Sequence, residues 1–252
     1  MTYCVGLVLD RGLVLMSDTR TNAGLDNIST FRKLTVFKKP GDRVISMMTA
    51  GNLATTQSVI SLLEERTKAP EDREPSIFAA PSMFQVARLV ADTLREVIAR
   101  QKDSGQRADS AFNATIILGG QIADGPTRLF LIYPEGNFIE AGRDTPYFQI
   151  GETKYGRPIL VRAYDPAMSF EAAVKLLLVS FDSTIKANLS VGAPLDVLLY
   201  EEGTLDAAEP LRITANDPYF RSISDGWGDA LRTAFYSLPD IDLDAVHDET
   251  AG

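Results

Sequence analysis

Residues 1–18 of the chain read MTYCVGLVLDRGLVLMSD. Two apolar, β-prone runs, 3–9 and 12–18, meet at Asp10-Arg11-Gly12, where the glycine can adopt a positive φ. This pattern predicts an antiparallel hairpin. Thr2 then stands at the start of its first strand and Asp18 at the end of its second.

Thr2 directly follows Met1, and its small side chain is of the kind that permits removal of an initiator methionine. A chain beginning with Thr2 would carry a nucleophilic hydroxyl and a basic α-amine, with an intrinsic pKa of about 7.7–8.0, on a single residue. This combination predicts an N-terminal nucleophile. The alternative is ordinary: many cytosolic chains begin with Met-Thr, and a strand can begin at position 2 without any catalytic role.

The composition of the 252 residues, with 45% apolar and 23% charged side chains, is typical of one large soluble domain. A net charge of −9 argues against a surface for nucleic acid or anionic membranes. The single cysteine, Cys4, cannot form an internal disulfide, and the sequence offers no Cys/His cluster for zinc, so we expect neither a metal nor another cofactor. Without an export signal or a membrane-length apolar run, a cytoplasmic location is expected.

The order of the remaining elements is predicted from apolar periodicity and turn residues. We expect a loop-rich segment over 142–158 and a turn at Gly119-Gly120. The expected strands are 31–37, 43–49, 113–118, 128–133, 137–141 and 195–200. The expected helices are 53–66, 83–100, 169–188 and 217–237.

This order predicts an α+β domain with two antiparallel sheets packed together and helices on both outer faces. We assign residues 1–240 to a single domain, in which 201–240 form a C-terminal extension. Residues 241–252 are predicted to be an acidic, flexible tail.

Four features together resemble the proteasome β-subunit family: Thr2 heading a strand, Asp18 closing the hairpin, Lys33 in the third strand, and Thr49-Ala50-Gly51 before a helix. The run TRTNAGLDNISTFRK at 19–33 is similar to one branch of it, the bacterial ancestral β subunit (Anbu). The resemblance extends to about Tyr200. It implies the four-layer αββα sandwich of N-terminal-nucleophile hydrolases.

The resemblance also implies catalytic roles. The Lys33 ammonium would favour the Thr2 alkoxide and lower the pKa of the α-amine, and Asp18 would hold Lys33 charged and in place. The backbone N–H of Gly51 would face the oxyanion, a contribution of about 3–4 kcal/mol. Taken singly, these residues have ordinary explanations as a strand-end cap, a solvated edge charge and a turn glycine.

Two supporting positions depart from the family pattern. Where proteasome β subunits carry a serine after a later glycine-rich loop, this chain has Glu152 following Gly151. Their Asp-x-x-Ser is replaced by a stretch in which Asn188 removes the carboxylate and Ser190 is one residue out of register. Glu152, Asn188 and Ser190 are therefore candidate supporting residues, and Glu152 could equally be a solvent-facing loop residue.

The function predicted from these residues is a threonine-type endopeptidase, with Thr2 as nucleophile, acting on peptides or unfolded proteins inside a large homo-oligomeric ring or helical stack. An ATPase activator is left open. Apolar residues on two outer helices, around Ile60-Ser61-Leu62-Leu63 and Phe84-Gln85-Val86, are expected to form the contacts between subunits. The alternatives are an N-terminal-nucleophile amidohydrolase for small amides and a catalytically silent assembly subunit.

Overall fold

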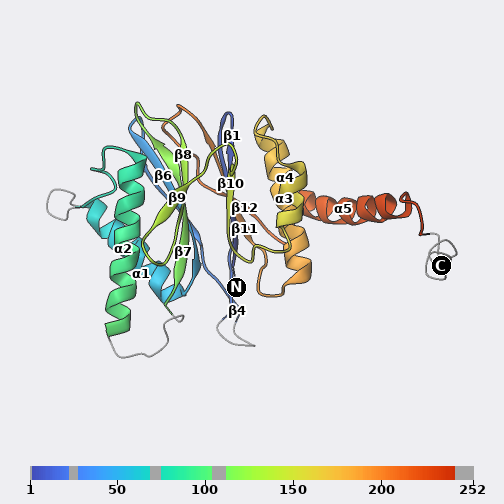
Figure 1. The fold of residues 1–252 in the computed structure, drawn as a ribbon, viewed down its shortest axis with the longest axis horizontal. Coiled ribbons are helices and arrows are strands. Elements are labelled where there is room, and N and C mark those ends of the chain that lie inside the picture. The colour runs from blue at the N-terminus through green and yellow to red at the C-terminus, as the bar shows by residue number, and fades with distance from the viewer. Residues whose placement is uncertain (1, 23–27, 69–74, 104–111, 242–252) are drawn as a thin grey trace, which may run out of the picture.

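The structure is a computed structural model that describes residues 2–22, 28–68, 75–103 and 112–241. Two five-stranded antiparallel sheets pack face to face, and helices cover the outer face of each (Figure 1). The predicted four-layer αββα sandwich is confirmed. The predicted acidic tail, apart from its first residue, lies outside the described residues.

The first sheet is built on the hairpin predicted from residues 3–18, which is confirmed with Leu9 facing Gly12. Its strands follow the order β10-β1-β2-β11-β12. Their bounds are β1 (Tyr3–Leu9), β2 (Gly12–Asp18), β10 (Tyr147–Gly151), β11 (Leu195–Glu201) and β12 (Leu211–Ile213). The segment 142–158 is largely loop, as predicted, but it also contains β10, which the prediction missed and whose backbone pairs with β1 from Tyr3 to Leu7.

The second sheet has the order β5-β6-β7-β8-β9. Its strands are β5 (Leu34–Lys39), β6 (Arg43–Gly51), β7 (Ala114–Ile122), β8 (Arg128–Ile132) and β9 (Phe138–Glu140), and a separate short pair comprises β3 (Arg20–Asn22) and β4 (Ile28–Thr30). Lys33 precedes β5 instead of lying in a strand. The turn predicted at Gly119-Gly120 is also wrong, because β7 continues through both glycines. A Cβ at Gly119 would lie 3.0 Å from Leu13 of the opposite sheet, so the glycine permits close packing there.

Five helices are described. Helices α1 (Leu53–Lys68) and α2 (Met83–Asp103) cover the second sheet, and α3 (Arg157–Ala163) and α4 (Phe170–Ala187) cover the first. Helix α5 (Pro218–Tyr236) projects away from the sandwich (Figure 1). Side chains at the helix starts explain where two of them begin: Ser169 caps α4, and Asp217 caps α5.

Strand β1 is buried on both faces, which explains its uninterrupted apolar sequence. Tyr3, Val5 and Leu7 point toward α3 and α4, and Cys4 points into the layer between the sheets. The alternation follows from the two-residue period of a strand. Since this strand lies inside two apolar layers, the residue immediately before it is held in a fixed position.

The prediction that α1 and α2 expose the apolar contacts was wrong for its central residues. Leu63 and Val86 are fully buried in the core beneath the two helices, and Ile60 and Leu62 are partly buried against it. Phe84 is exposed, as predicted. Exposed large apolar side chains instead gather on α5 and just after it, at Tyr219, Leu231, Phe235, Tyr236 and Leu238. Across the described parts of the chain, none of the helices combines the length and apolar character that a membrane span requires.

Candidate active site

Thr2 directly precedes β1, at one end of the strands of the first sheet, and is held there by the end of β10. Its carbonyl accepts a hydrogen bond of 2.6 Å from the Glu152 N–H, and only 9% of the residue is exposed. Gly151 has a φ of +84°, and a Cβ at this position would lie 1.9 Å from the Thr2 carbonyl oxygen. Glycine is therefore required for β10 to approach Thr2 this closely.

Asp18 ends β2 directly beside Thr2 and is completely buried. Its Oδ1 accepts hydrogen bonds from the backbone N–H of Tyr3 at 3.0 Å and from the Lys33 ammonium at 2.6 Å. Burial raises the pKa of Asp18 above its ordinary range, while the charge of Lys33 and the N–H groups of Tyr3 and Gly192 oppose this rise. The carboxylate thus connects the backbone next to Thr2 with Lys33.

Lys33 completes a buried ion pair. Its side chain is 6% exposed, and its ammonium also donates to the Arg20 carbonyl at 2.7 Å. The main chain of Lys33 is fixed as well, because its carbonyl accepts from the N–H of Thr49 at 3.1 Å. The ammonium is therefore held by Asp18 and the Arg20 carbonyl, and the main chain of Lys33 by Thr49.

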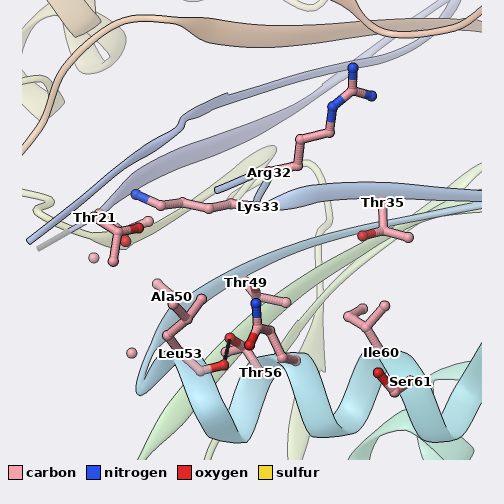
Figure 2. A pocket seen from close by; sticks show the side chains of 14 residues that line it. Thr21, Arg32, Lys33, Thr35, Thr49, Ala50, Leu53, Thr56, Ile60 and Ser61 are labelled. Carbon is pink, nitrogen blue, oxygen red and sulfur yellow. Dashed lines mark hydrogen bonds between the residues drawn. The ribbon is translucent and has the colours of Figure 1, made fainter. Parts of the chain in front are cut away.

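A cavity of about 700 Å³ opens beside these residues, and Thr2, Lys33, Gly51 and Gly151 all line it. Gly51 ends β6 with a φ of +118°, and a Cβ there would lie 2.3 Å from the Asn113 carbonyl oxygen. Figure 2 shows the cavity between Lys33 and the first turns of α1. The structure thus brings Thr2, Asp18, Lys33 and Gly51 together, with Asp18 behind Lys33 and outside the cavity lining.

The candidate supporting residues Glu152 and Asn188 are in direct contact. Asn188, which ends α4, donates from Nδ2 to Glu152 Oε2 at 3.0 Å, and the Lys154 N–H donates to Oε1 at 3.2 Å. Glu152 is only 8% exposed, so its interpretation as a solvent-facing loop residue was wrong. Ser190 contacts this group through its backbone, whose N–H donates to Asn188 Oδ1 at 2.9 Å.

Sequence reasoning missed two arginines at the site. Arg20 accepts a hydrogen bond from Lys33 through its carbonyl and donates from its side chain to the Leu189 carbonyl at 2.9 Å. Arg32 lines the cavity. Its position directly before Lys33 was a signal that could have identified it. Cys4 is fully buried, and burial raises the pKa of its thiol, which fits a core residue.

The fold and the residues that meet in the cavity define the class of protein as a proteasome-type subunit with an N-terminal-nucleophile-hydrolase-like architecture. The family profile described as "Proteasome subunit" matches residues 2–198, and the chain belongs to this family. A curated relative, the proteasome subunit beta of Haloquadratum walsbyi, is 25% identical over 210 residues, which cover 82% of this chain and 76% of that protein.

Solved structures of Anbu proteins are more similar. Anbu from Yersinia bercovieri shares 48% identity with a TM-score of 0.89, over 96% of this chain and 100% of that one. Anbu from Hyphomicrobium sp. strain MC1 shares 50% identity with a TM-score of 0.88 over the same shares. The helical assembly of the Anbu complex from Pseudomonas aeruginosa shares 47% identity with a TM-score of 0.89, over 96% and 99%. The predicted resemblance to the Anbu branch is confirmed.

Proposed function

We propose that this chain is a threonine-type endopeptidase whose nucleophile is Thr2 after removal of Met1. The observation that carries the proposal is the buried Lys33–Asp18 pair beside Thr2, at the edge of a cavity large enough for a peptide side chain. A fully buried ion pair is expensive to desolvate, and its position at a cavity favours a catalytic use over a purely structural one.

In the proposed reaction, the free α-amine of Thr2 accepts the proton of its own hydroxyl, and the oxygen attacks the carbonyl carbon of the scissile peptide bond. The Lys33 ammonium stabilises the developing alkoxide, and the Gly51 N–H donates to the tetrahedral oxyanion. The C–N bond then breaks, and the leaving amine takes the proton from the α-ammonium. Water activated by the same α-amine hydrolyses the resulting ester and regenerates Thr2.

Glu152 and Asn188 are proposed as positioning residues for this amine. The backbone of Glu152 holds the Thr2 carbonyl, and Asn188 holds the Glu152 carboxylate. A carboxylate at this position would favour the protonated amine that forms during attack. The carboxylate near the Thr2 amine is thus supplied by Glu152, after β10, because position 188 at the end of α4 is an asparagine.

We further propose that the chain works as a homo-oligomer that encloses the cavities of its subunits. Helix α5 supports this, because Phe235 is 68% and Tyr236 is 81% exposed on a helix that projects from the body. The Pseudomonas aeruginosa relative is described as a helical assembly. Enclosure would admit only peptides and unfolded proteins to the cavities. An ATPase activator remains part of the hypothesis, without an identified partner.

The proposal is tested by measuring the release of new amino termini from an unfolded protein substrate. Thr2→Ala and Lys33→Ala are expected to abolish release, and Asp18→Asn to lower it less completely. Near-normal release by Lys33→Ala would contradict the assignment. Release that survives in Thr2→Ala would mean that another group is the nucleophile.

A further inference from the structure

The lining of the cavity is unusual for an acidic chain. Among the described residues that line it, the charged ones are Arg32 and Lys33, both cationic, and none is a carboxylate. The chain as a whole carries a net charge of −9. The local sign of charge in the cavity is therefore opposite to that of the whole chain, and it favours anionic groups.

The two cations are not equivalent. The Lys33 ammonium is engaged by Asp18 at 2.6 Å and by the Arg20 carbonyl at 2.7 Å. Arg32 is exposed and makes no hydrogen bond or ion pair with any residue that the structure describes. Figure 2 shows its side chain on the side of the cavity opposite α1, with the guanidinium directed away from the helix. Arg32 is thus an exposed cation without a partner in the described chain, and rotation about its side-chain bonds would bring the guanidinium to a ligand in the cavity.

Neutral donors surround the same space. Thr35 lies on the segment that carries Arg32, and Ser61 faces it from α1, as Figure 2 shows, while Gln57 adds an amide from the same helix. Within the described chain these three side chains have no hydrogen-bond partner. Leu53 and Ile60 supply a modest apolar wall for the stem of a bound side chain.

From this arrangement we propose that the cavity recognises an acidic side chain, glutamate or aspartate, on the residue whose carbonyl Thr2 attacks, and that Arg32 pairs with its carboxylate. This deepens the proposed function and rests on it. Arginine offers a planar pair of donors that matches a carboxylate. A lysine at that position would instead meet a like charge, and a neutral isostere would lose the ion pair.

The test compares three peptide epoxyketones that differ only at this position, with Glu, Gln or Lys, and measures the rate of adduct formation by intact mass. Glu is expected to react about tenfold faster than Gln, in line with a charge-assisted hydrogen bond, and Lys slowest. Raising the salt concentration is expected to reduce the Glu preference, because Arg32 is exposed.

Arg32→Gln supplies the decisive comparison, since Arg32 has no hydrogen-bond or ion-pair partner among the described residues whose loss would disturb the fold. The ratio of Glu to Gln rates is expected to fall to about one in this variant. In the control Arg143→Gln, an exposed arginine outside the cavity lining, the ratio is expected to stay as in the parent chain. An unchanged ratio in Arg32→Gln would overturn the proposal.

Recognition is also measured apart from chemistry by calorimetric binding of the same three peptides as C-terminal amides without the reactive group. Tighter binding of the Glu peptide that is lost in Arg32→Gln supports the proposal even if no adduct forms. If adducts form at equal rates with the Glu and Gln peptides, the proposed peptidase function stands and the proposed acidic preference is overturned. Absence of adducts together with equal binding of all three amides would overturn both.

Discussion

Replacing Lys33 with methionine removes the charge from the buried pair while keeping most of the apolar stem. Asp18 is completely buried, and the Lys33 ammonium lies 2.6 Å from it. Removing one partner of such a pair leaves a buried charge without compensation, which costs about 3–5 kcal/mol. We expect Lys33→Met to lose about this much free energy of unfolding at pH 7.

The loss is expected to depend on pH with a defined sign. Burial already raises the pKa of Asp18, and Lys33 opposes the rise, so removing Lys33 moves the pKa of the folded variant still higher above the unfolded value of about 3.9. The folded variant then binds a proton more tightly than its unfolded chain. Its stability relative to the parent is therefore greatest below about pH 4 and falls as pH rises, by at most about 1.4 kcal/mol per pH unit.

Urea unfolding followed by circular dichroism between pH 4 and pH 8, at one fixed protein concentration, measures this difference. Lys175→Met, which removes an exposed lysine from α4, is the matched control and is expected to match the parent throughout. Combining Lys33→Met with Asp18→Asn is expected to remove the pH dependence. If Lys33→Met were as stable as the parent at pH 7, with no pH-dependent difference, the argument for a buried charged pair would be wrong.

Three further changes test the surroundings of the site. Gly151→Ala places a Cβ 1.9 Å from the Thr2 carbonyl oxygen at a positive φ, so the free energy of unfolding should fall by about 1–3 kcal/mol or more. The control Gly142→Ala, whose Cβ would lie in open space, should stay within about 0.5 kcal/mol of the parent, and equal effects of the two changes would contradict the close approach. Asn188→Asp replaces a donor to Glu152 with a like charge and should cost about 1–3 kcal/mol at pH 7, partly recovered on acidification; no loss would mean that the 3.0 Å contact is absent in solution. Phe235→Asp should shift light-scattering mass toward the 27.5 kDa of one chain, and an unchanged large particle would place the subunit contacts elsewhere.

Local sequence was sufficient for the hairpin that carries Thr2 and Asp18. The turn glycine and the two apolar runs lie within 18 residues, so short-range turn chemistry decides the pairing. Strand β10 could not be predicted in the same way, because its five residues are surrounded by polar, glycine-containing sequence. Its identity as a strand comes from pairing with β1, which is remote in sequence. The turn predicted at Gly119-Gly120 was wrong for a related reason. Gly119 permits close packing against Leu13 of the opposite sheet, and a Cβ at Gly120 would lie 2.0 Å from the Val44 carbonyl oxygen of the neighbouring strand β6.

The catalytic candidates were predictable because their order along the chain matches a family pattern, whereas the contacts between them were not. Nothing local in the sequence shows that Asn188 reaches Glu152, since one ends α4 and the other follows β10. The free guanidinium of Arg32 also needed the structure, because an arginine beside Lys33 could equally have been paired with a neighbouring carboxylate.

The central claim is that Thr2 becomes the amino terminus and acts as the nucleophile. Intact-mass measurement before and after exposure to a peptide epoxyketone, which requires both the hydroxyl and the free α-amine, tests it most directly. We expect a chain without Met1 that gains one adduct per subunit, mapped to Thr2 and lost in Lys33→Ala. A chain that retains Met1, a processed chain that gains no adduct, or an adduct on another residue would contradict it.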